Sequence, residues 1–502
     1  MATDDHPAIR SILLGTLLAA VLAAGPAEAQ QITGLSATTL ARSGRLLVYG
    51  TGFGAVQGQG QVLIDGLSAV ATTWSDTEIH AYVPEEAALA TVSVMVERDA
   101  GGTSNAELLE VVARQAEGRF LWRFEMDSAH VGPWLARGAD GTVYGSDSDR
   151  LYALTPGGAL KWALAGAGGE RPITFGADGT IFVAAEEVPG QPQGVIAVNP
   201  NGTVRWSYAF TSGYDLMAGP GVGPDGNIYA TSNTNAGGPG TFALDADGNL
   251  LWTNPGPGAN FINLHEIDFA SDRFYSSYNA QGGSAIIVAY DYAGNELWSS
   301  SDLGQVTGSA PELDPSERLI LARGSTGVQA WTPDAQIDWI YDPGAMPNVV
   351  VPTVGPDGVI YDGTWNGGDL FAINPDGTER WLLENQIDGF LWHLGVAPDN
   401  SVLVDGGAPG YGHPSRIRGF ATADGALLWE QSFHVENGLN EFANWLEPVF
   451  TPDSRTAYVT TEFSGGTQSG YLYAVDVSNE GETIFADGFE SGDTSGWSAT
   501  IP

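Results

Sequence analysis

The sequence predicts an all-β protein in which a small immunoglobulin-like β-sandwich is followed by an eight-bladed β-propeller. The first observation is a tryptophan that recurs eight times with spacings of 40 to 48 residues. A period of this size, built from short strands, is typical of a propeller with one four-stranded sheet per repeat. The second observation is a set of short alternating strands ahead of the repeats. The recurring residues are Trp122, Trp162, Trp206, Trp252, Trp298, Trp339, Trp381 and Trp429.

Each repeat ends in a β-hairpin. In one of them the apolar strand Leu370–Ile373 leads into the turn Asn374–Gly377, and a return strand closes on Trp381. Asp-Gly in such a turn supplies the positive φ angle that the backbone needs. Residues 348–354 and 359–361 provide two more strands of the same repeat. We therefore expect four strands per repeat, A to D from the centre outward, with the tryptophan of strand D packed between blades rather than bound to a cofactor.

The two ends of the repeat region complement each other. Residues 118–122 form a lone D strand, whereas residues 446–450, 456–460 and 471–475 supply strands A, B and C with no tryptophan after them. Seven complete units and one shared unit make eight blades over residues 119–477. Strand exchange between the two ends would leave the ring without a free sheet edge.

The chain starts with a predicted signal peptide, residues 1–29. The apolar run 11–24 is short for a membrane span, and Ala27-Glu28-Ala29 fits a small-x-small cleavage site. An uncleaved membrane anchor is the alternative. Because no second apolar run follows, we expect no transmembrane segment in the mature chain and an exported protein, whether periplasmic, on the outer surface or secreted.

Residues 31–113 are predicted to form the sandwich, and residues 114–118 a linker. Strands are expected at 45–49, 61–64, 78–83 and 91–96, with a first strand at 35–39. Motifs in this segment resemble the IPT/TIG immunoglobulin-like domain, although the first strand lacks the usual proline. The resemblance implies a non-catalytic module that serves as a spacer or lid, or in adhesion or glycan contact. The matching motifs are Tyr49–Gly54, Val62–Gly66, Trp74–Ile79, Val83-Pro84 and Thr103–Asn105.

Charge and composition exclude several classes of function. The formal net charge is −41 and Lys161 is the only lysine, so we expect no nucleic-acid partner and no anionic membrane surface. The acid excess serves either solubility, which we favour, or loading with a cation such as calcium. There is no cysteine, which excludes Cys-ligated metal, covalent c-type haem and thiol catalysis.

The repeat resembles the pyrroloquinoline-quinone (PQQ)-like propeller repeat of quinoprotein dehydrogenases and outer-membrane assembly lipoproteins. Segments 197–206 and 243–252 follow its Ala-x-Asp…Gly-x-x-x-Trp pattern with a turn one residue shorter, and 419–429 keeps its length with glycine first. Enzymes of that family stack the quinone on a disulfide, which this chain cannot form. Asp245–Gly248 has a calcium-loop pattern but lies where a hairpin turn is needed. We therefore predict no catalytic residue, no metal site and no cofactor; PQQ and calcium are disfavoured alternatives.

A candidate ligand site follows from strand direction. Because strands alternate in direction, the D–A and B–C connections share one face of the ring, which we call the funnel face. All five propeller histidines fall on these connections, with aromatic and acidic residues beside them, and ligands commonly enter a propeller there. The competing explanation is that longer connections carry more residues of every kind. The candidates are His130, Trp134, Asp215, His265, Glu266, Trp392, His393, His413, His434, Glu441 and Trp445.

These observations favour an exported, non-enzymatic propeller that binds or scaffolds a protein or glycan partner at the cell surface. The alternative is an enzyme, either a divergent PQQ-dependent dehydrogenase or a carbohydrate-active propeller. Residues 478–502 resemble a short Phe-x-Asp-Gly-Phe-Glu tail found at the ends of exported bacterial proteins, for which sorting or a plain acidic end are the two interpretations. The partner and the oligomeric state are not determined by the sequence.

Overall fold

A computed structural model gives the fold, and every regular element among the residues that it describes is a strand, β1 to β43. Within the part of the chain that it describes, no helix has the length and apolar character of a membrane span. The residues described are 30–128, 131–169, 171–185, 194–209, 216–232, 240–256, 267–279, 285–300, 312–322, 327–342, 352–364, 368–384, 394–405, 415–436, 439–443, 448–463 and 469–478.

The N-terminal domain is a sandwich of two sheets that share one apolar core. Alternation decides which side chains enter the core: in β8, Val92, Val94 and Val96 are buried and the residues between them are not. The first strand begins earlier than the sequence indicated, at Gln31: Ile32 is buried in the core and Leu35, at the end of the strand, packs against it. One sheet has the order β1 (Gln31–Leu35), β3 (Arg45–Thr51), β7 (Glu78–Tyr82) and β6 (Val70–Trp74). The other has the order β2 (Thr39–Ala41), β9 (Glu107–Val112), β8 (Thr91–Glu97), β4 (Gln61–Ile64) and β5 (Leu67–Ser68).

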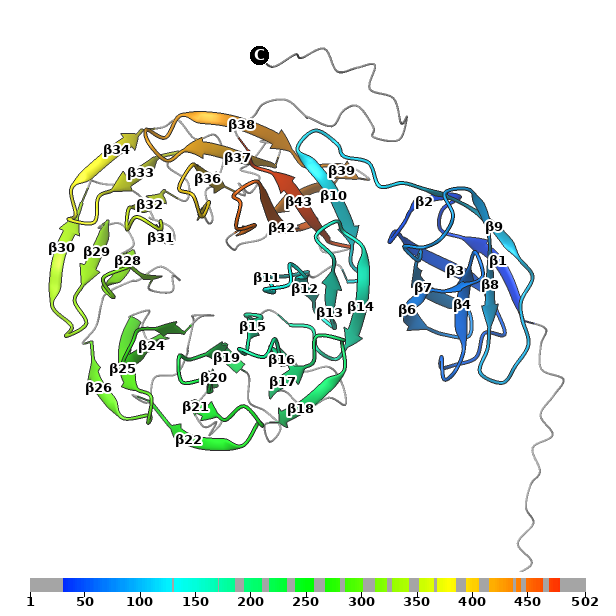
Figure 1. The fold of residues 1–502 in the computed structure, drawn as a ribbon, viewed down its shortest axis with the longest axis horizontal. Helices are drawn as coiled ribbons and strands as arrows, with labels where there is room; N and C mark the ends of the chain where they lie inside the picture. Colours follow the sequence, from blue (N-terminus) through cyan, green and yellow to red (C-terminus); the bar gives the residue numbers. More distant parts are fainter. Residues whose placement is uncertain are drawn as a thin grey trace, which may run out of the picture.

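The next sheets each consist of four consecutive strands, paired antiparallel in chain order, and they follow one another around a common centre in a propeller-like arrangement (Figure 1). The first three are β11 (Val131–Arg137), β12 (Val143–Asp147), β13 (Arg150–Leu154), β14 (Leu160–Ala165); β15 (Thr174–Phe175), β16 (Ile181–Ala185), β17 (Gly194–Val198), β18 (Val204–Ala209); and β19 (Leu216–Val222), β20 (Ile228–Ser232), β21 (Thr241–Leu244), β22 (Leu250–Asn254). The next two are β23 (Asp268–Phe269), β24 (Arg273–Asn279), β25 (Ala285–Asp291), β26 (Glu296–Ser299); and β27 (Glu312–Leu313), β28 (Leu319–Ala322), β29 (Val328–Trp331), β30 (Ile337–Tyr341). The last two are β31 (Thr353–Val354), β32 (Ile360–Gly363), β33 (Leu370–Ile373), β34 (Glu379–Leu383); and β35 (Leu394–Val396), β36 (Val402–Asp405), β37 (Arg416–Ala421), β38 (Leu427–Ser432).

A further sheet combines strands from distant parts of the chain. Its order is β10-β43-β42-β40-β39, and β41 also pairs with β42. The hairpin β39–β40 was not expected from the sequence, which placed only a strand at 446–450 ahead of β42. Both β40 and β41 pair with β42, at its two ends. The strands are β10 (Phe120–Glu125), β39 (Val435–Glu436), β40 (Leu439–Ala443), β41 (Val449–Phe450), β42 (Thr456–Phe463) and β43 (Tyr471–Asp476).

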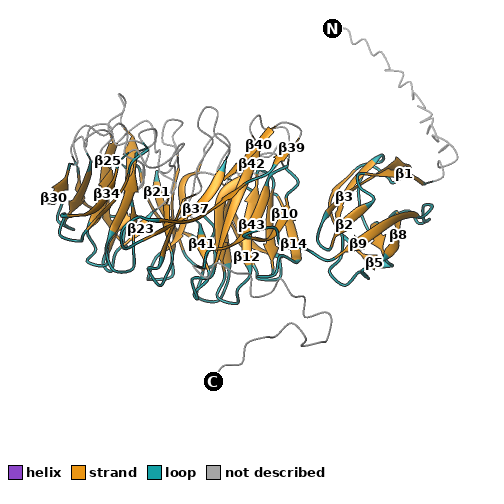
Figure 2. Cartoon of the chain, turned by 90° about the horizontal axis from the view of Figure 1, so that it is seen from above, coloured by secondary structure: helices purple, strands orange, loops and turns teal. Residues whose placement is uncertain are grey.

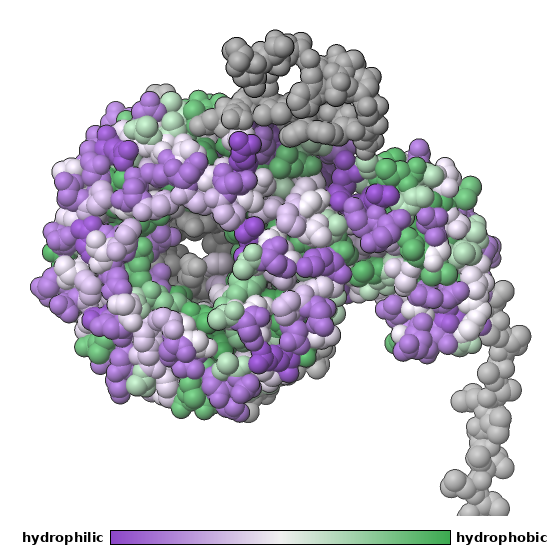
Figure 3. Space-filling model, in the orientation of Figure 1, coloured by the Kyte–Doolittle hydropathy of each residue, from purple (hydrophilic) through white to green (hydrophobic). Residues whose placement is uncertain are grey.

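The turns between the first and second and between the third and fourth strands lie on one face of the ring, while the β39–β40 hairpin rises on the other, the funnel face (Figure 2). We call the face that carries these turns the turn face. The space-filling view looks onto it and shows mostly hydrophilic residues (Figure 3). Carboxylates on this face close the turns themselves. Asp245, for example, accepts backbone N–H bonds from Asp247 at 3.0 Å and Asn249 at 2.9 Å.

The recurring tryptophans join each sheet to the next. In seven of them the indole Nε1–H donates to a carbonyl oxygen in the third turn of the following sheet, at 2.8 to 3.2 Å. The indole ring covers the glycine of that turn: a Cβ on Gly294 would lie 2.6 Å from the ring of Trp252. At one junction alanine replaces the glycine, and Ala335 has the same left-handed backbone with φ of 60°. The indole is therefore both a wedge and a hydrogen-bond donor.

Trp429 differs from the other seven. Its Nε1 has no hydrogen-bond partner among the described residues, and the guanidinium of Arg119 lies 4.6 Å above its ring. The reason is connectivity, because in the following sheet β43 and β10 come from different parts of the chain and no turn joins them. Arg119 occupies this place and bonds the carbonyl oxygens of Asp476 at 3.0 Å and Ser478 at 3.1 Å.

Two glycines form a matched pair for testing the indole contact. Gly226 and Gly294 have φ angles of 79° and 84°, but an added Cβ meets nothing within 4 Å at Gly226. We expect Gly226→Ala to lose about 1–2 kcal/mol of unfolding free energy through backbone strain. Gly294→Ala should lose a further 1–3 kcal/mol or so, because the methyl group overpacks against Trp252. Urea unfolding monitored by tryptophan fluorescence measures both, and equal losses would contradict the role given to the covered glycine.

Candidate functional site

Most of the candidate residues named from the sequence lie outside the described part of the chain: His130, Asp215, His265, Glu266, Trp392, His393, His413 and Trp445. The other three are Trp134 on β11, His434 just before β39 and Glu441 on β40. Strand β11 packs against β42, the strand that pairs with β40. The structure therefore places these three residues on adjoining elements and brings His434 and Glu441 into direct contact.

The β39–β40 hairpin sets the geometry of His434 and Glu441. The backbone N–H of Glu441 donates to the carbonyl oxygen of His434 at 3.1 Å, and that of His434 to Oε2 of Glu441 at 3.3 Å. These bonds place the imidazole Nδ1 3.4 Å from Oε2 of Glu441. Although seven positions separate them in the chain, the two side chains are neighbours because the hairpin folds one onto the other.

Glu441 is fully buried, with 0% of its surface exposed, and both of its oxygens are hydrogen-bonded. Oε1 accepts a bond from Thr461 Oγ1 at 2.5 Å, and Oε2 accepts one from the Tyr473 hydroxyl at 2.9 Å. Burial and the adjacent Glu441 charge raise the pKa of Tyr473 well above its ordinary value, so the phenol remains a donor. A buried carboxylate is stable in this setting because donors surround it.

His434 connects this buried carboxylate to the linker that follows the sandwich. Its Nε2 lies 2.9 Å from Oε2 of Glu117, and its Nδ1 lies 3.1 Å from the hydroxyl of Tyr473. The hydrogen bond with Glu441 is the largest cause of a raised pKa at His434; burial opposes it and Glu117 adds to it. The arrangement therefore favours the protonated form of His434, and its contacts join the hairpin, the linker and β43.

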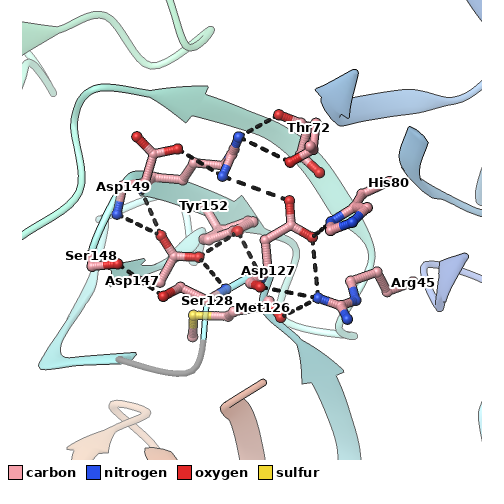
Figure 4. A network of polar contacts seen from close by, with 12 residues as sticks. Arg45, Thr72, His80, Met126, Asp127, Ser128, Asp147, Ser148, Asp149 and Tyr152 are labelled. Atoms are coloured by element: carbon pink, nitrogen blue, oxygen red, sulfur yellow. Dashed lines mark hydrogen bonds and ion pairs between the residues drawn. The ribbon is translucent and has the colours of Figure 1, made fainter. Parts of the chain in front are cut away.

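A second polar cluster lies where the sandwich meets the ring, and Figure 4 shows it from close by. Its centre is Asp127, which follows β10 and has a nearly buried side chain. Arg45 from β3 donates to the backbone carbonyl of Asp127 at 3.1 Å, and His80 Nδ1 from β7 lies 3.3 Å from its Oδ1. Burial alone would raise the pKa of Asp127, but hydrogen bonds from His80 and Thr72 and the charge of Arg45 hold it below its usual value.

The other side of this cluster is built on the link between β12 and β13. Asp147 is buried and accepts backbone N–H bonds from Asp149 at 2.9 Å and Arg150 at 2.7 Å, and a bond from the Tyr152 hydroxyl at 2.7 Å. Burial is the main cause of a raised pKa at Asp147. These bonds fix the link between β12 and β13, and the guanidinium of Arg150 at the start of β13 donates to the carbonyl oxygen of Thr72 in the sandwich.

Apolar packing accompanies these polar contacts. Tyr82 of the sandwich stacks on Phe124 of β10 with ring centroids 5.0 Å apart, and its hydroxyl donates to the carbonyl oxygen of Glu125 at 2.9 Å. Tyr82 belongs to one apolar cluster with Phe124, Tyr152 and Leu472 of the ring. The sandwich therefore contributes a side chain to the core of the neighbouring domain, which is a packed junction rather than a loose tether.

Within the described ranges, no three histidine, aspartate or glutamate side chains are arranged to hold a metal ion. Sequence patterns did not indicate Glu117, Thr461 and Tyr473 around the His434 pair, or Asp127 and Arg150 at the junction. Their partners are remote in the chain: Glu117 and His434 are 317 positions apart. No local pattern could have joined them.

Comparison with known proteins supports both parts of the fold. The family model of the IPT/TIG domain matches residues 31–111. The C-terminal WD40 domain of Sif2 is 11% identical, with a TM-score of 0.53, over 70% of this chain and 98% of that one. Streptogramin B lyase (15% identical, TM-score 0.41) covers 70% of this chain and 96% of its own. An inactive virginiamycin B lyase from Staphylococcus aureus with quinupristin (13%, 0.42) covers 56% and 94%.

None of the curated proteins matches the chain. At 11% identity, the likeness to the Sif2 domain speaks for the fold alone. The chain is thus an all-β protein with an IPT/TIG domain at its N-terminal side and a propeller-like domain of four-stranded sheets after it.

Tyr473 provides a test of the buried cluster. Tyr473→Phe removes the hydroxyl that donates to Glu441 and leaves a buried carboxylate with one bond fewer. We expect a loss of about 1–3 kcal/mol in unfolding free energy. The control is Tyr49→Phe, because Tyr49 is 37% exposed and its substitution should stay within about 0.5 kcal/mol of the parent. If Tyr473→Phe behaves like Tyr49→Phe in urea unfolding, the cluster does not stabilise the last sheet.

Proposed function

We propose that this chain is a non-enzymatic binding or scaffold protein that presents a propeller and an IPT/TIG domain in a fixed relation to a protein or glycan partner at the cell surface. The observation that carries the proposal is the junction around Asp127. Arg45, His80 and Tyr82 of the sandwich contact β10 and the aspartate that follows it, through Glu125 and Asp127. In Figure 2 the sandwich lies beside the ring and not over the face on which the β39–β40 hairpin rises, and we propose that this face is open to a partner.

We further propose that the sheets form an eight-bladed ring in which β10 is the outer strand of the last blade. Two features support this: β10 pairs with β43 from Phe120↔Val475 to Glu125↔Tyr471, and Arg119 occupies the place where Trp429 would otherwise meet a turn. The PQQ-like repeat pattern is part of the same proposal, because its Gly and Trp positions are those at which an indole covers a turn glycine.

Export is likewise part of the proposal. The segment 1–29 has the pattern of a signal peptide, and domains of the IPT/TIG family are commonly extracellular. A net charge of −41 suits a soluble exported protein and disfavours nucleic acid as a partner. We propose the funnel face as the binding surface, with His393 and Trp445 among the contact residues.

A pull-down with the mature chain as bait tests this surface. We expect His393→Ala and Trp445→Ala together to lower recovery of the partner at least about tenfold, since central aromatic residues carry much of the binding energy. Asp247→Ala with Asp376→Ala is the matched control, because both aspartates are exposed in turns of the opposite face. Equal recovery with both pairs of substitutions would place the binding surface elsewhere, and a glycan array distinguishes a carbohydrate from a protein partner.

The enzyme alternative predicts a different result. The purified chain should show no new absorbance band after incubation with PQQ and calcium followed by removal of the free quinone. A retained quinone that becomes reduced when an alcohol or sugar is added would overturn the proposal in favour of a dehydrogenase. Retention without reduction would make the quinone a bound ligand and would also contradict the absence of a cofactor.

A further inference from the structure

Two histidines lie in the described part of the chain, and each imidazole stands between two carboxylates. His80 Nε2 is 2.8 Å from Oε1 of Glu78, and its Nδ1 is 3.3 Å from Oδ1 of Asp127. In both cases one carboxylate belongs to the ring and the other to the sandwich or its linker. Asp127 follows β10 of the ring, whereas Glu78 is on β7 of the sandwich.

His434 has the corresponding arrangement at the other end of β10. Its Nδ1 is 3.4 Å from Oε2 of Glu441, which belongs to the ring, and its Nε2 is 2.9 Å from Oε2 of Glu117, in the linker after the sandwich. The Tyr473 hydroxyl also lies 3.1 Å from Nδ1 and itself donates to Glu441. Because that hydroxyl already donates its proton to Glu441, Nδ1 has to be the donor toward it.

Proton counting decides which form of each imidazole fits. A neutral imidazole carries one N–H, whereas an imidazolium carries two. Each histidine here has acceptors at both nitrogens, so the charged form satisfies both contacts. The neutral form would leave one nitrogen lone pair facing an acceptor oxygen, at a site partly removed from water.

We propose that His80 and His434, with Glu78, Asp127, Glu117 and Glu441, form a histidine clamp that holds the IPT/TIG domain against the propeller while both imidazoles are protonated and loosens it when they are not. The clamp acts at two points on the path from the sandwich to the ring. Its loss would leave the sandwich attached by the remaining contacts of Tyr82, Arg45 and Arg150. The clamp works in the same way whatever partner the funnel face binds.

Other charged groups around the two histidines shift the pH range over which the imidazoles lose their protons. His80 faces Arg45 on β3, whose charge opposes protonation, and Asp127 is shared with Arg45 and with Arg150 on β13. His434 faces Arg123 on β10, whose positive charge likewise opposes protonation of the imidazole. The carboxylates raise the pKa of each histidine more than the arginines lower it, because the hydrogen bonds to Asp127 and Glu441 are the largest causes of the two shifts.

The direction of the pH dependence follows from these shifts. The bond with Asp127 raises the pKa of His80 above 6.5, and the bond with Glu441 does the same for His434. A raised pKa means that the stabilising contribution is complete below the ordinary histidine value and is lost as the pH rises through the raised value. Between those values the ratio of docked to undocked sandwich should fall by at most about tenfold per pH unit for each histidine.

Single-molecule energy transfer can measure the docked fraction in the full chain. The sequence has no cysteine, so Leu108→Cys on the sandwich and Val204→Cys on β18 give two unique label sites, 65% and 51% exposed. We expect one narrow distribution at pH 6 and a growing second, broad population up to pH 9. Circular dichroism at each pH verifies that both domains remain folded.

Substitutions identify the titrating groups. His80→Gln with His434→Gln should lower the docked fraction at pH 6 and abolish its pH dependence, and each single substitution should remove part of it. Glu296→Gln on the far sheet, exposed like Glu117, is the control and should behave as the parent. A parent distribution that is constant from pH 6 to pH 9, or a double variant that keeps the full response, would overturn the proposal. Should the double variant not fold, the two single variants decide by the same criterion.

Discussion

The structure depends above all on the contact between an outer-strand indole and the turn of the next sheet. A single four-stranded sheet of this kind has two apolar faces and cannot bury them alone. The indole fills the gap between neighbours, and its N–H gives the packing a direction, because only the carbonyl oxygen of the following turn receives it. The turn residue beneath the indole needs a small side chain and a positive φ angle. This position is therefore glycine or, at position 335, an alanine with positive φ.

The exception at Trp429 explains how the domain junction fits into this scheme. No turn lies beside Trp429, and Arg119 stacks on its indole instead. From Arg119 the chain runs through β10 to Phe124 and Asp127, on which the sandwich packs. Strand β10 therefore pairs with β43 along its length and contacts the sandwich at its C-terminal end. Any force that shifts β10 acts on both.

The acidic character of the chain also has a structural use. On the turn face the aspartates accept backbone N–H bonds within their own turns, as Asp178 does from Thr180; hydrogen bonds from Thr180 and Arg205 lower its pKa to about 2. At the junctions, by contrast, Asp127 and Glu441 are buried and surrounded by donors. Carboxylates thus close turns on the surface and fix domain contacts inside.

The sequence by itself determined the period of the repeat, the sandwich with its IPT/TIG motifs and the class of turn, because these arise from residues a few positions apart. It named His434 and Glu441 as candidates, yet contained no sign that the two touch or that Glu117 completes the contact. Only the tertiary structure decided this, as it decided the hairpin β39–β40 and the seat of the sandwich on β10. The reason is distance along the chain: His80 and Asp127 are 47 positions apart and Glu117 and His434 are 317 apart, and contacts of that kind exist only in the folded chain.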